Sequence, residues 1–329
     1  MLNFAAGFFG VPDYQTDFNM EIEIEASGLN ASGAPYDMCP NSNNARGSVG
    51  STAAAVFVEP WFNKTAERLN TYLSGDLSFA GPDITSMLQL CAYETDALGY
   101  SAFCPLFTQE EFEVFEQFYD IQACTLAHRF TLLSILITSA CQFHGNNGFG
   151  SPVAAAQGLA YLQELVSRLN HTLITNFDSE TNSTLDGNNV TFPLFQSIYA
   201  DAAHEVSIMD ALTALNLTAL VQSGAPSNET LSNHTYVASK VVPFATSLQI
   251  QVMECAPSVP TKQIRFILND AVIPLTYEGC SLDQNGLCAY DTVLGALINR
   301  IDEIDYTYDC YANYSVPYYG EVTNGRAPQ

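Results

Sequence analysis

Basic side chains are scarce in this sequence. Lysine and arginine together number 10, against 35 aspartates and glutamates, which gives a formal net charge of −25. Binding to nucleic acid or to an anionic membrane surface depends on clustered positive charge. The charge balance therefore excludes both as primary partners. The apolar run at 130–140 is also far shorter than the roughly 20 residues that span a bilayer, so we expect no membrane insertion.

Several catalytic signatures are absent. The chain has no G-x-S-x-G nucleophile turn, H-E-x-x-H zinc motif, P-loop or G-x-G-x-x-G fingerprint. Its nine cysteines include no C-x-x-C pair of the kind that binds zinc or acts in redox catalysis. We therefore expect neither a metal centre nor a cofactor. The abundant carboxylates leave a glycosidase acid pair open, but no spacing singles one out.

Asparagine in Asn-x-Ser/Thr sequons is, by contrast, plentiful. The nine predicted glycosylation sites are Asn30, Asn63, Asn170, Asn182, Asn189, Asn216, Asn228, Asn233 and Asn313. This density favours a secreted glycoprotein, in which cysteines form disulfides. The first ten residues nevertheless lack the basic region of a secretory signal, and an odd cysteine count leaves one thiol without a partner. Both observations predict that an N-terminal portion is missing.

Hydrophobic periodicity predicts helices mainly in the middle of the chain. A helix is expected over 52–70, with Pro60 ending or kinking it, and a capping box at Thr108–Glu111 opens another. Ser151 and Pro152 are expected to start a helix that continues to Leu169. The aromatic stripe that follows the capping box is interpreted as core rather than as a ligand site.

Alternating and β-branched segments predict strands on either side of this middle. They cover 21–25, 195–200, 248–252 and a hairpin of 264–268 with 271–275, and a helix is expected over 206–215. The predicted fold class is α/β, with a Rossmann-like three-layer α/β domain of residues 1–30 and 171–329. A mostly helical domain, 31–170, is inserted into it.

Position weakens four of the five histidines as catalytic candidates. His171 and His234 lie within sequons and are expected to be exposed, and His144 precedes a loop rich in glycine and asparagine. His128 lies in a segment of unusual composition. The remaining candidate is His204.

His204 and Glu205 lie between a predicted strand and the start of a predicted helix. Ligands bind at such junctions in open α/β sheets, and a helix N-terminus favours an anion. In one interpretation His204 donates to a bound anion while Glu205 acts as a general acid or base. In the other, a carboxylate caps the helix beside an ordinary half-buried histidine. The dipeptide alone leaves both open.

Seven ordered stretches carry a resemblance that covers nearly the whole chain. They are Ala34–Pro40 (APYDMCP), Leu90–Tyr100 (LCAYETDALGY), Phe103–Phe112 (FCPLFTQEEF), Gly148–Gly158 (GFGSPVAAAQG), Tyr199–Glu205 (YADAAHE), Ile267–Leu275 (ILNDAVIPL) and the loop from Cys280 to Cys288. Together they resemble a fungal secreted histidine acid phosphatase of the phytase and acid phosphatase family. That family has an α/β domain and a smaller α domain.

The resemblance implies hydrolysis of a small phosphomonoester without a cofactor. It implies that His204 contacts a phosphate oxygen and that Glu205 is the proton donor to the leaving oxygen. In the family, the nucleophile is a histidine of an Arg-His-Gly-x-Arg-x-Pro motif. This chain contains no Arg-His-Gly, and its arginines are scattered. The nucleophile is therefore expected upstream, and the chain as given is expected to be inactive. The alternative is a noncatalytic secreted glycoprotein of the same fold.

The family's cysteine pattern, carried over by position, implies three disulfides: Cys39–Cys310, Cys91–Cys104 and Cys280–Cys288. Cys255 would then pair with a cysteine upstream of this chain. Segment 123–141 interrupts a region that is continuous in the family. It is interpreted either as a translated intron or mispredicted exon boundary, or as a real insertion closed by Cys124 and Cys141.

Overall fold

The computed structural model describes most of the chain. The described residues are 1–14, 16, 19–26, 28–121, 144–222, 226–257, 260–281 and 285–329. Segment 123–141, with His128 and the Cys124–Cys141 alternative, lies outside them, as does the side chain of His144.

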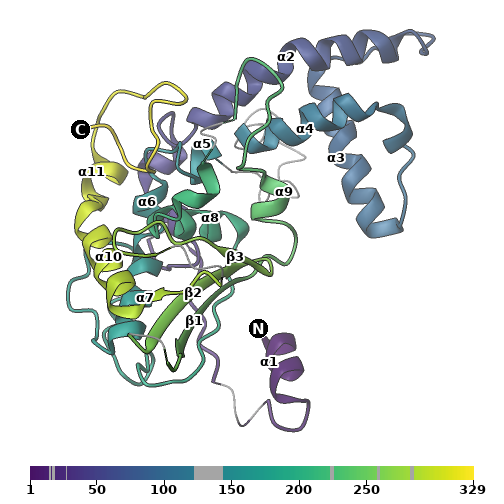
Figure 1. Ribbon diagram of the computed structural model, residues 1–329. Coiled ribbons are helices and arrows are strands. Elements are labelled where there is room, and N and C mark those ends of the chain that lie inside the picture. The colour runs from purple at the N-terminus through teal and green to yellow at the C-terminus, as the bar shows by residue number, and fades with distance from the viewer. Residues whose placement is uncertain are drawn as a thin grey trace.

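Helices make up most of the regular structure (Figure 1). The α-helices are α1 (Leu2–Phe9), α2 (Val49–Asn70), α3 (Gly81–Leu98), α4 (Gln109–Ile121), α5 (His144–Asn147), α6 (Ala154–Gln157), α7 (Leu159–Asn170), α8 (Glu205–Ala214), α9 (Ala238–Val241), α10 (Tyr290–Glu303) and α11 (Tyr306–Tyr311). The strands are β1 (Leu248–Glu254), β2 (Lys262–Leu268), β3 (Ala271–Ile273) and β4 (Cys288–Ala289). Short 3₁₀ turns cover Pro35–Asp37, Pro40–Asn43, Cys104–Leu106 and Thr218–Val221. Within the described ranges, no helix is long and apolar enough to cross a bilayer.

The sheet is organised around β2, which pairs antiparallel with β1, β3 and β4. The predicted hairpin is confirmed: β2 turns into β3 at Asn269 and Asp270, both with positive φ as a tight hairpin turn requires. Ile264 and Phe266 point from β2 into the core and are fully buried. Helices α7, α8 and α10 supply the other side of this core, which we call the sheet cluster.

A second core lies among α2, α3 and α4, at the upper right of Figure 1, and is called the helical cluster. The predicted capping box is confirmed, since the Thr108 N–H donates to Glu111 Oε2 at 2.8 Å and the Glu111 N–H to Thr108 Oγ1 at 3.3 Å. The aromatic stripe packs into this cluster, with Phe118 buried, as expected of a core. Helix α2 runs unbroken through Pro60, so of the two effects expected of this proline, ending or kinking the helix, the first is wrong. Pro60 lies on an exposed face, where water can satisfy the freed carbonyl.

Two strand predictions are wrong. Residues 21–25 and 195–200 are irregular. Both carry an alternating or apolar pattern, but a strand forms only when its backbone pairs with a neighbour, and neither segment has a ladder partner among the described residues. Their apolar side chains consequently remain on the surface: Ile22 is 70% exposed and Phe195 80%.

The predicted helix from Ser151 to Leu169 is divided into α6 and α7 at Gly158, and Val153, not Ser151, occupies the N-cap position of α6. Helix α8 packs against this point so closely that a Cβ on Gly158 would lie 2.1 Å from the carbonyl oxygen of Asp210. A helix interior with ordinary side chains could not admit that contact.

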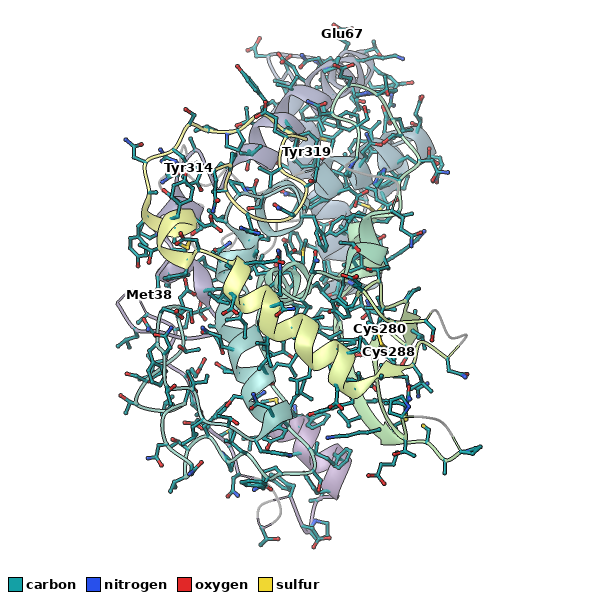
Figure 2. All side chains as sticks on the ribbon, turned by 60° about the vertical axis from the view of Figure 1, so that its left-hand side comes forward. Met38, Glu67, Cys280, Cys288, Tyr314 and Tyr319 are labelled. Carbon is teal, nitrogen blue, oxygen red and sulfur yellow. A yellow bond between two sulfur atoms is a disulfide. The ribbon has the colours of Figure 1, made fainter. Side chains whose placement is uncertain are left out.

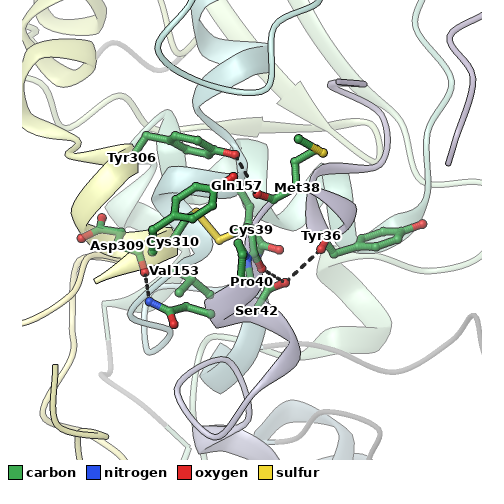
Figure 3. The surroundings of a disulfide bond; sticks show 12 residues. Tyr36, Met38, Cys39, Pro40, Ser42, Val153, Gln157, Tyr306, Asp309 and Cys310 are labelled. Carbon is green, nitrogen blue, oxygen red and sulfur yellow. Dashed lines mark hydrogen bonds between the residues drawn. A yellow bond between two sulfur atoms is a disulfide. The ribbon is translucent and has the colours of Figure 1, made fainter. Parts of the chain in front are cut away.

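Among the described residues there are three disulfides, Cys39–Cys310, Cys91–Cys104 and Cys280–Cys288, of which only the first joins distant parts of the chain. These are the pairs that the resemblance implies, and Cys255 is a free thiol. Figure 3 shows that Cys39–Cys310 fixes the turn near Tyr36 to α11; around it, Asn41 donates to the Asp309 carbonyl at 2.8 Å. Figure 2 shows Cys280–Cys288 near the start of α10.

Removing the long-range disulfide should destabilise the protein more than removing a short one. Cys39 and Cys310 are 271 residues apart, whereas Cys280 and Cys288 are 8 apart. Loop-closure entropy then predicts a loss of about 5.5 kcal/mol of unfolding free energy for Cys39→Ser/Cys310→Ser, against about 2.5 kcal/mol for Cys280→Ser/Cys288→Ser. Urea denaturation followed by fluorescence measures both; equal losses would contradict the entropic account.

His234 is a buried member of an ion pair, so the expectation that both sequon histidines are exposed holds only for His171. The His234 side chain is 7% exposed, and its Nε2 lies 2.9 Å from Asp120 Oδ2 on α4. Asp120 also accepts from the backbone N–H of Ala238 at the start of α9. Burial opposes the charge on His234, but the Asp120 carboxylate holds the pKa of His234 above its ordinary value. Burial likewise raises the pKa of Asp120.

The pair should therefore make stability depend on pH. A histidine whose pKa is raised on folding contributes its full stabilisation below the unfolded-state pKa of about 6.5, and that contribution is lost as pH rises through the folded-state pKa. Wild-type unfolding free energy should fall from pH 6 to pH 9 relative to His234→Gln. Denaturant titrations across this range test the prediction, with His171→Gln as control. A difference between wild type and His234→Gln that does not change with pH would contradict it.

Candidate active site

Helix α8 presents His204 and Glu205 at its N-terminal end. His204 is the N-cap residue and Glu205 the first helical residue. The predicted helix over 206–215 is thus confirmed, although residues 195–200 before it do not form the predicted strand. The N-terminal end of α8 is attached to the segment around Gly33, because the Ser207 hydroxyl donates to the Gly33 carbonyl at 2.7 Å. The unpaired N–H groups of a helix N-terminus favour an anion at this position.

The His204 ring is already paired with a carboxylate from the N-terminal segment. Its Nε2 lies 2.9 Å from Glu25 Oε2, and both side chains are substantially exposed. The Tyr36 hydroxyl donates to the other oxygen of Glu25. The hydrogen bonds from Tyr36 and then His204 lower the pKa of Glu25, which keeps this carboxylate charged. The Nε2 of His204 therefore faces an oxyanion supplied by the protein itself.

The Glu205 carboxyl lies beside this pair and is incompletely hydrogen-bonded. Its Oε1 is buried and has no hydrogen-bond partner in the part of the chain that the structure describes. Burial raises the pKa of Tyr36, and the nearby charges of Glu25, Asp37 and Glu205 raise it further. A buried acceptor without a donor costs about 1–3 kcal/mol, so such an atom typically marks a place where a ligand or water donates. Glu205 Oε1 thus keeps an unused acceptor position beside the His204–Glu25 pair.

One arginine reaches this region although none adjoins His204 in the sequence. Arg168 on α7 forms a bidentate pair with Asp201, at 2.6 and 3.0 Å. Its guanidinium also lies 5.1 Å from the ring centres of both Phe192 and Tyr199. Asp201 holds both terminal nitrogens of this guanidinium, while its buried Nε has no hydrogen-bond partner among the described residues.

The other histidines with described side chains lie in different surroundings. His171 Nδ1 contacts the Leu194 carbonyl at 2.5 Å, and His234 pairs with Asp120. The site therefore combines one imidazole, two carboxylates and a helix N-terminus, which suits binding an oxygen atom and transferring a proton. Nothing in this described set is placed to attack phosphorus beside His204.

Sequence reasoning missed Glu25 and Tyr36 as site residues. Glu25 lies in a segment predicted to be a strand, and Tyr36 is part of the stretch Ala34–Pro40 that carries the resemblance. No spacing links either residue to His204, because the contact joins segments separated by 179 positions. The short run of acidic residues at 21–25 was the available signal, and its alternation pointed to a strand instead.

Comparison with known proteins identifies the family of the chain. A family model described as the histidine phosphatase superfamily (branch 2) matches residues 2–269. Phytase A of Aspergillus oryzae is 29% identical over 83% of this chain and 54% of its own length. Phytase A of Aspergillus terreus is 30% identical over 76% of this chain and 50% of its own. The chain thus spans about half the length of the curated relatives it matches.

A solved structure shares the fold. The crystal structure of the phytase from D. castellii superposes with a TM-score of 0.61, at 18% identity, over 88% of this chain and 52% of that one. The predicted α/β fold class is confirmed by this similarity.

Removing the Glu25 carboxylate should expose the His204 ring nitrogen. In Glu25→Ala, diethyl pyrocarbonate should acylate His204 several-fold faster than in wild type, because Nε2 loses its partner. Peptide mass mapping at matched times measures the rate, with His171 as an internal reference and Glu21→Ala as the matched control. An unchanged His204 rate in Glu25→Ala would show that the pair does not persist in solution.

Proposed function

The chain belongs to branch 2 of the histidine phosphatase superfamily, and on that premise we propose that its α8 end forms the proton-donating side of a phosphomonoester-hydrolysing site. The observation that carries the proposal is the position of Glu205, whose buried Oε1 lacks a hydrogen-bond partner in the described structure, next to His204 at a helix N-terminus. An anion bound at this end would meet both side chains.

Each side chain has a distinct role in the proposal. His204 donates from Nε2 to a phosphate oxygen, replacing the Glu25 carboxylate that occupies this position in the structure. Glu205 gives its proton to the leaving oxygen, because an alkoxide is a poor leaving group. A positioned general acid typically accelerates such a step by about 10²–10⁴-fold.

The attacking group is proposed to come from outside residues 1–329. The mechanism proceeds through a phosphohistidine, and the chain has no Arg-His-Gly segment to supply the nucleophile and the clamping arginines. Glu25 and Glu205 would repel a phosphate dianion in the absence of such a clamp. The chain as given is therefore proposed to be inactive alone.

The substrate class is a small phosphomonoester. Two relatives are named Phytase A, but a substrate with several phosphates favours a basic rim, and only 10 basic residues are present. Simple phosphomonoesters are therefore preferred over phytate. The disulfides and the sequons support a secreted glycoprotein. The proposed domains are an α/β domain of 1–30 and 171–329 and a helical domain of 31–170; the helical cluster lies within the second range, whereas α7 of that range packs into the sheet cluster.

One observation favours a second candidate, a noncatalytic secreted glycoprotein of the same fold. The His204 ring already pairs with Glu25, and Glu25 also accepts a hydrogen bond from Tyr36. A carboxylate of the protein itself therefore occupies the position proposed for the phosphate. The upstream genomic sequence separates the candidates: an in-frame Arg-His-Gly-x-Arg-x-Pro segment supports the enzyme, and a stop codon directly before Met1 supports the noncatalytic form.

Glu205 should matter in proportion to the basicity of the leaving group. In a form of the protein that carries the nucleophile, Glu205→Gln should lower kcat on alkyl phosphates by about 10²-fold or more, and on p-nitrophenyl phosphate far less. Glu205→Asp is the matched variant and should retain most activity because it keeps an ionisable acid. Equal losses on both substrates in Glu205→Gln would refute the acid role.

Residues 1–329 alone should not hydrolyse phosphomonoesters. With p-nitrophenyl phosphate at pH 5, wild type, His204→Ala and Glu205→Gln should all give the rate of buffer, because no nucleophile is present. Phosphate release measured on purified protein checks this expectation. Hydrolysis by wild type that disappears in His204→Ala would place the nucleophile within the chain.

A further inference from the structure

A second group of carboxylates lies outside the His204 site. Glu23 from the N-terminal segment, Glu164 on α7 and Asp186 in the loop after α7 each place one oxygen within 4.8 Å of the others. Glu164 and Asp186 are buried and Glu23 is half-buried. The N-terminal segment thus meets α7 and the loop that follows it at one small volume of negative charge.

The positive charge nearest to this group is already engaged. Arg168 forms its short bidentate contact with Asp201, whereas its Nη2 lies 3.6 Å from Glu164 Oε2, beyond hydrogen-bond distance. One guanidinium cannot neutralise Asp201 and three further carboxylates. Burial in this excess of negative charge is costly unless a cation or bound protons balance it.

The hydrogen bonding of Glu164 is a second observation, independent of the clustering, that indicates a ligand. Its side chain is 5% exposed, and Oε1 has no hydrogen-bond partner among the described residues. The other two side chains are partly satisfied: Asp186 accepts from the Asn182 N–H at 2.7 Å, and Glu23 accepts from the Ser32 hydroxyl at 3.4 Å and from the backbone N–H groups of Gly33 and Ser32. Each carboxylate therefore keeps lone pairs that can be directed at a shared ion.

We propose that Glu23, Glu164 and Asp186 bind one divalent cation of the calcium class. The donor set consists only of carboxylate oxygens, which suits a hard cation and not zinc or copper. Calcium lies about 2.3–2.6 Å from its oxygens, so ligands on opposite sides of the ion are separated by roughly 5 Å. The three oxygens lie within 4.8 Å of one another, close enough to share one such ion. The variable coordination of calcium also tolerates an irregular set of carboxylates better than the strict octahedral geometry of magnesium does.

The ion would link the N-terminal segment to α7. Glu23 lies two residues before Glu25, so fixing Glu23 also restrains the carboxylate that faces His204. Burial and the neighbouring carboxylates raise the pKa of Asp186 to about 6, despite the Asn182 N–H and Arg168. The proposal does not depend on phosphatase activity.

Calcium titration of residues 1–329 tests the site. After EDTA treatment at pH 7, calorimetric titration with CaCl₂ should show one saturable site, and CaCl₂ should raise Tm more than MgCl₂ does. Asp186→Asn and Glu164→Gln keep the side-chain shapes and should each weaken calcium binding by at least about 10-fold. Asp302→Asn, which removes an exposed carboxylate elsewhere, should bind calcium like wild type.

Two results would overturn the proposal. Calcium binding that is absent, or equal in wild type and Asp186→Asn, would show that the cluster is not a cation site. A wild type whose Tm ignores calcium and rises on acidification, with Glu164→Gln more stable at pH 7, would show that protons alone neutralise the carboxylates. Circular dichroism of each variant without calcium verifies that it is folded, and either substitution serves if the other does not fold.

Discussion

The close contact between α8 and the turn at Gly158 determines where α8 lies, and with it the position of His204 and Glu205 at the start of this helix. With a Cβ at this turn only 2.1 Å from the Asp210 carbonyl oxygen, any side chain there would push α8 outward. Within the same contact, the Asn147 amide donates to both oxygens of the buried Asp210 carboxyl, at 3.1 and 3.0 Å. Burial raises the pKa of Asp210 well above its ordinary value. Helix α8 is therefore held along its length, and its first residues have a defined position.

Electrostatics determine what that fixed helix end can do. Glu25 and Glu205 lie beside a single imidazole, and Arg168 is engaged by Asp201. This end of the molecule can orient an oxygen and supply a proton, but it cannot also stabilise a phosphate dianion. The cluster of Glu23, Glu164 and Asp186 near Arg168 has a similar excess of negative charge. The excess of acidic residues in the sequence thus leaves negative charge incompletely balanced at two places in the structure, beside His204 and around Glu164.

The sequence predicted local structure well where the structure depends on contacts between residues that are close in the sequence. The hairpin at Asn269 and Asp270 and the capping box at Thr108 depend on neighbouring residues, so their signals were sufficient. Segments 21–25 and 195–200 failed because a strand needs a partner that local pattern does not reveal. His204 was found through its dipeptide and the resemblance. Glu25 was not, since its contact depends on a fold that brings residues separated by 179 positions together.

Binding of a tetrahedral oxyanion tests the central claim most directly. A crystal structure of the form of the protein that carries the nucleophile, soaked with tungstate, should show one anion oxygen within hydrogen-bond distance of His204 Nε2. Another should lie against Glu205, with Glu25 displaced from the imidazole. Tungstate bound elsewhere, with His204 still paired to Glu25 and Glu205 covered by protein atoms, would contradict the account.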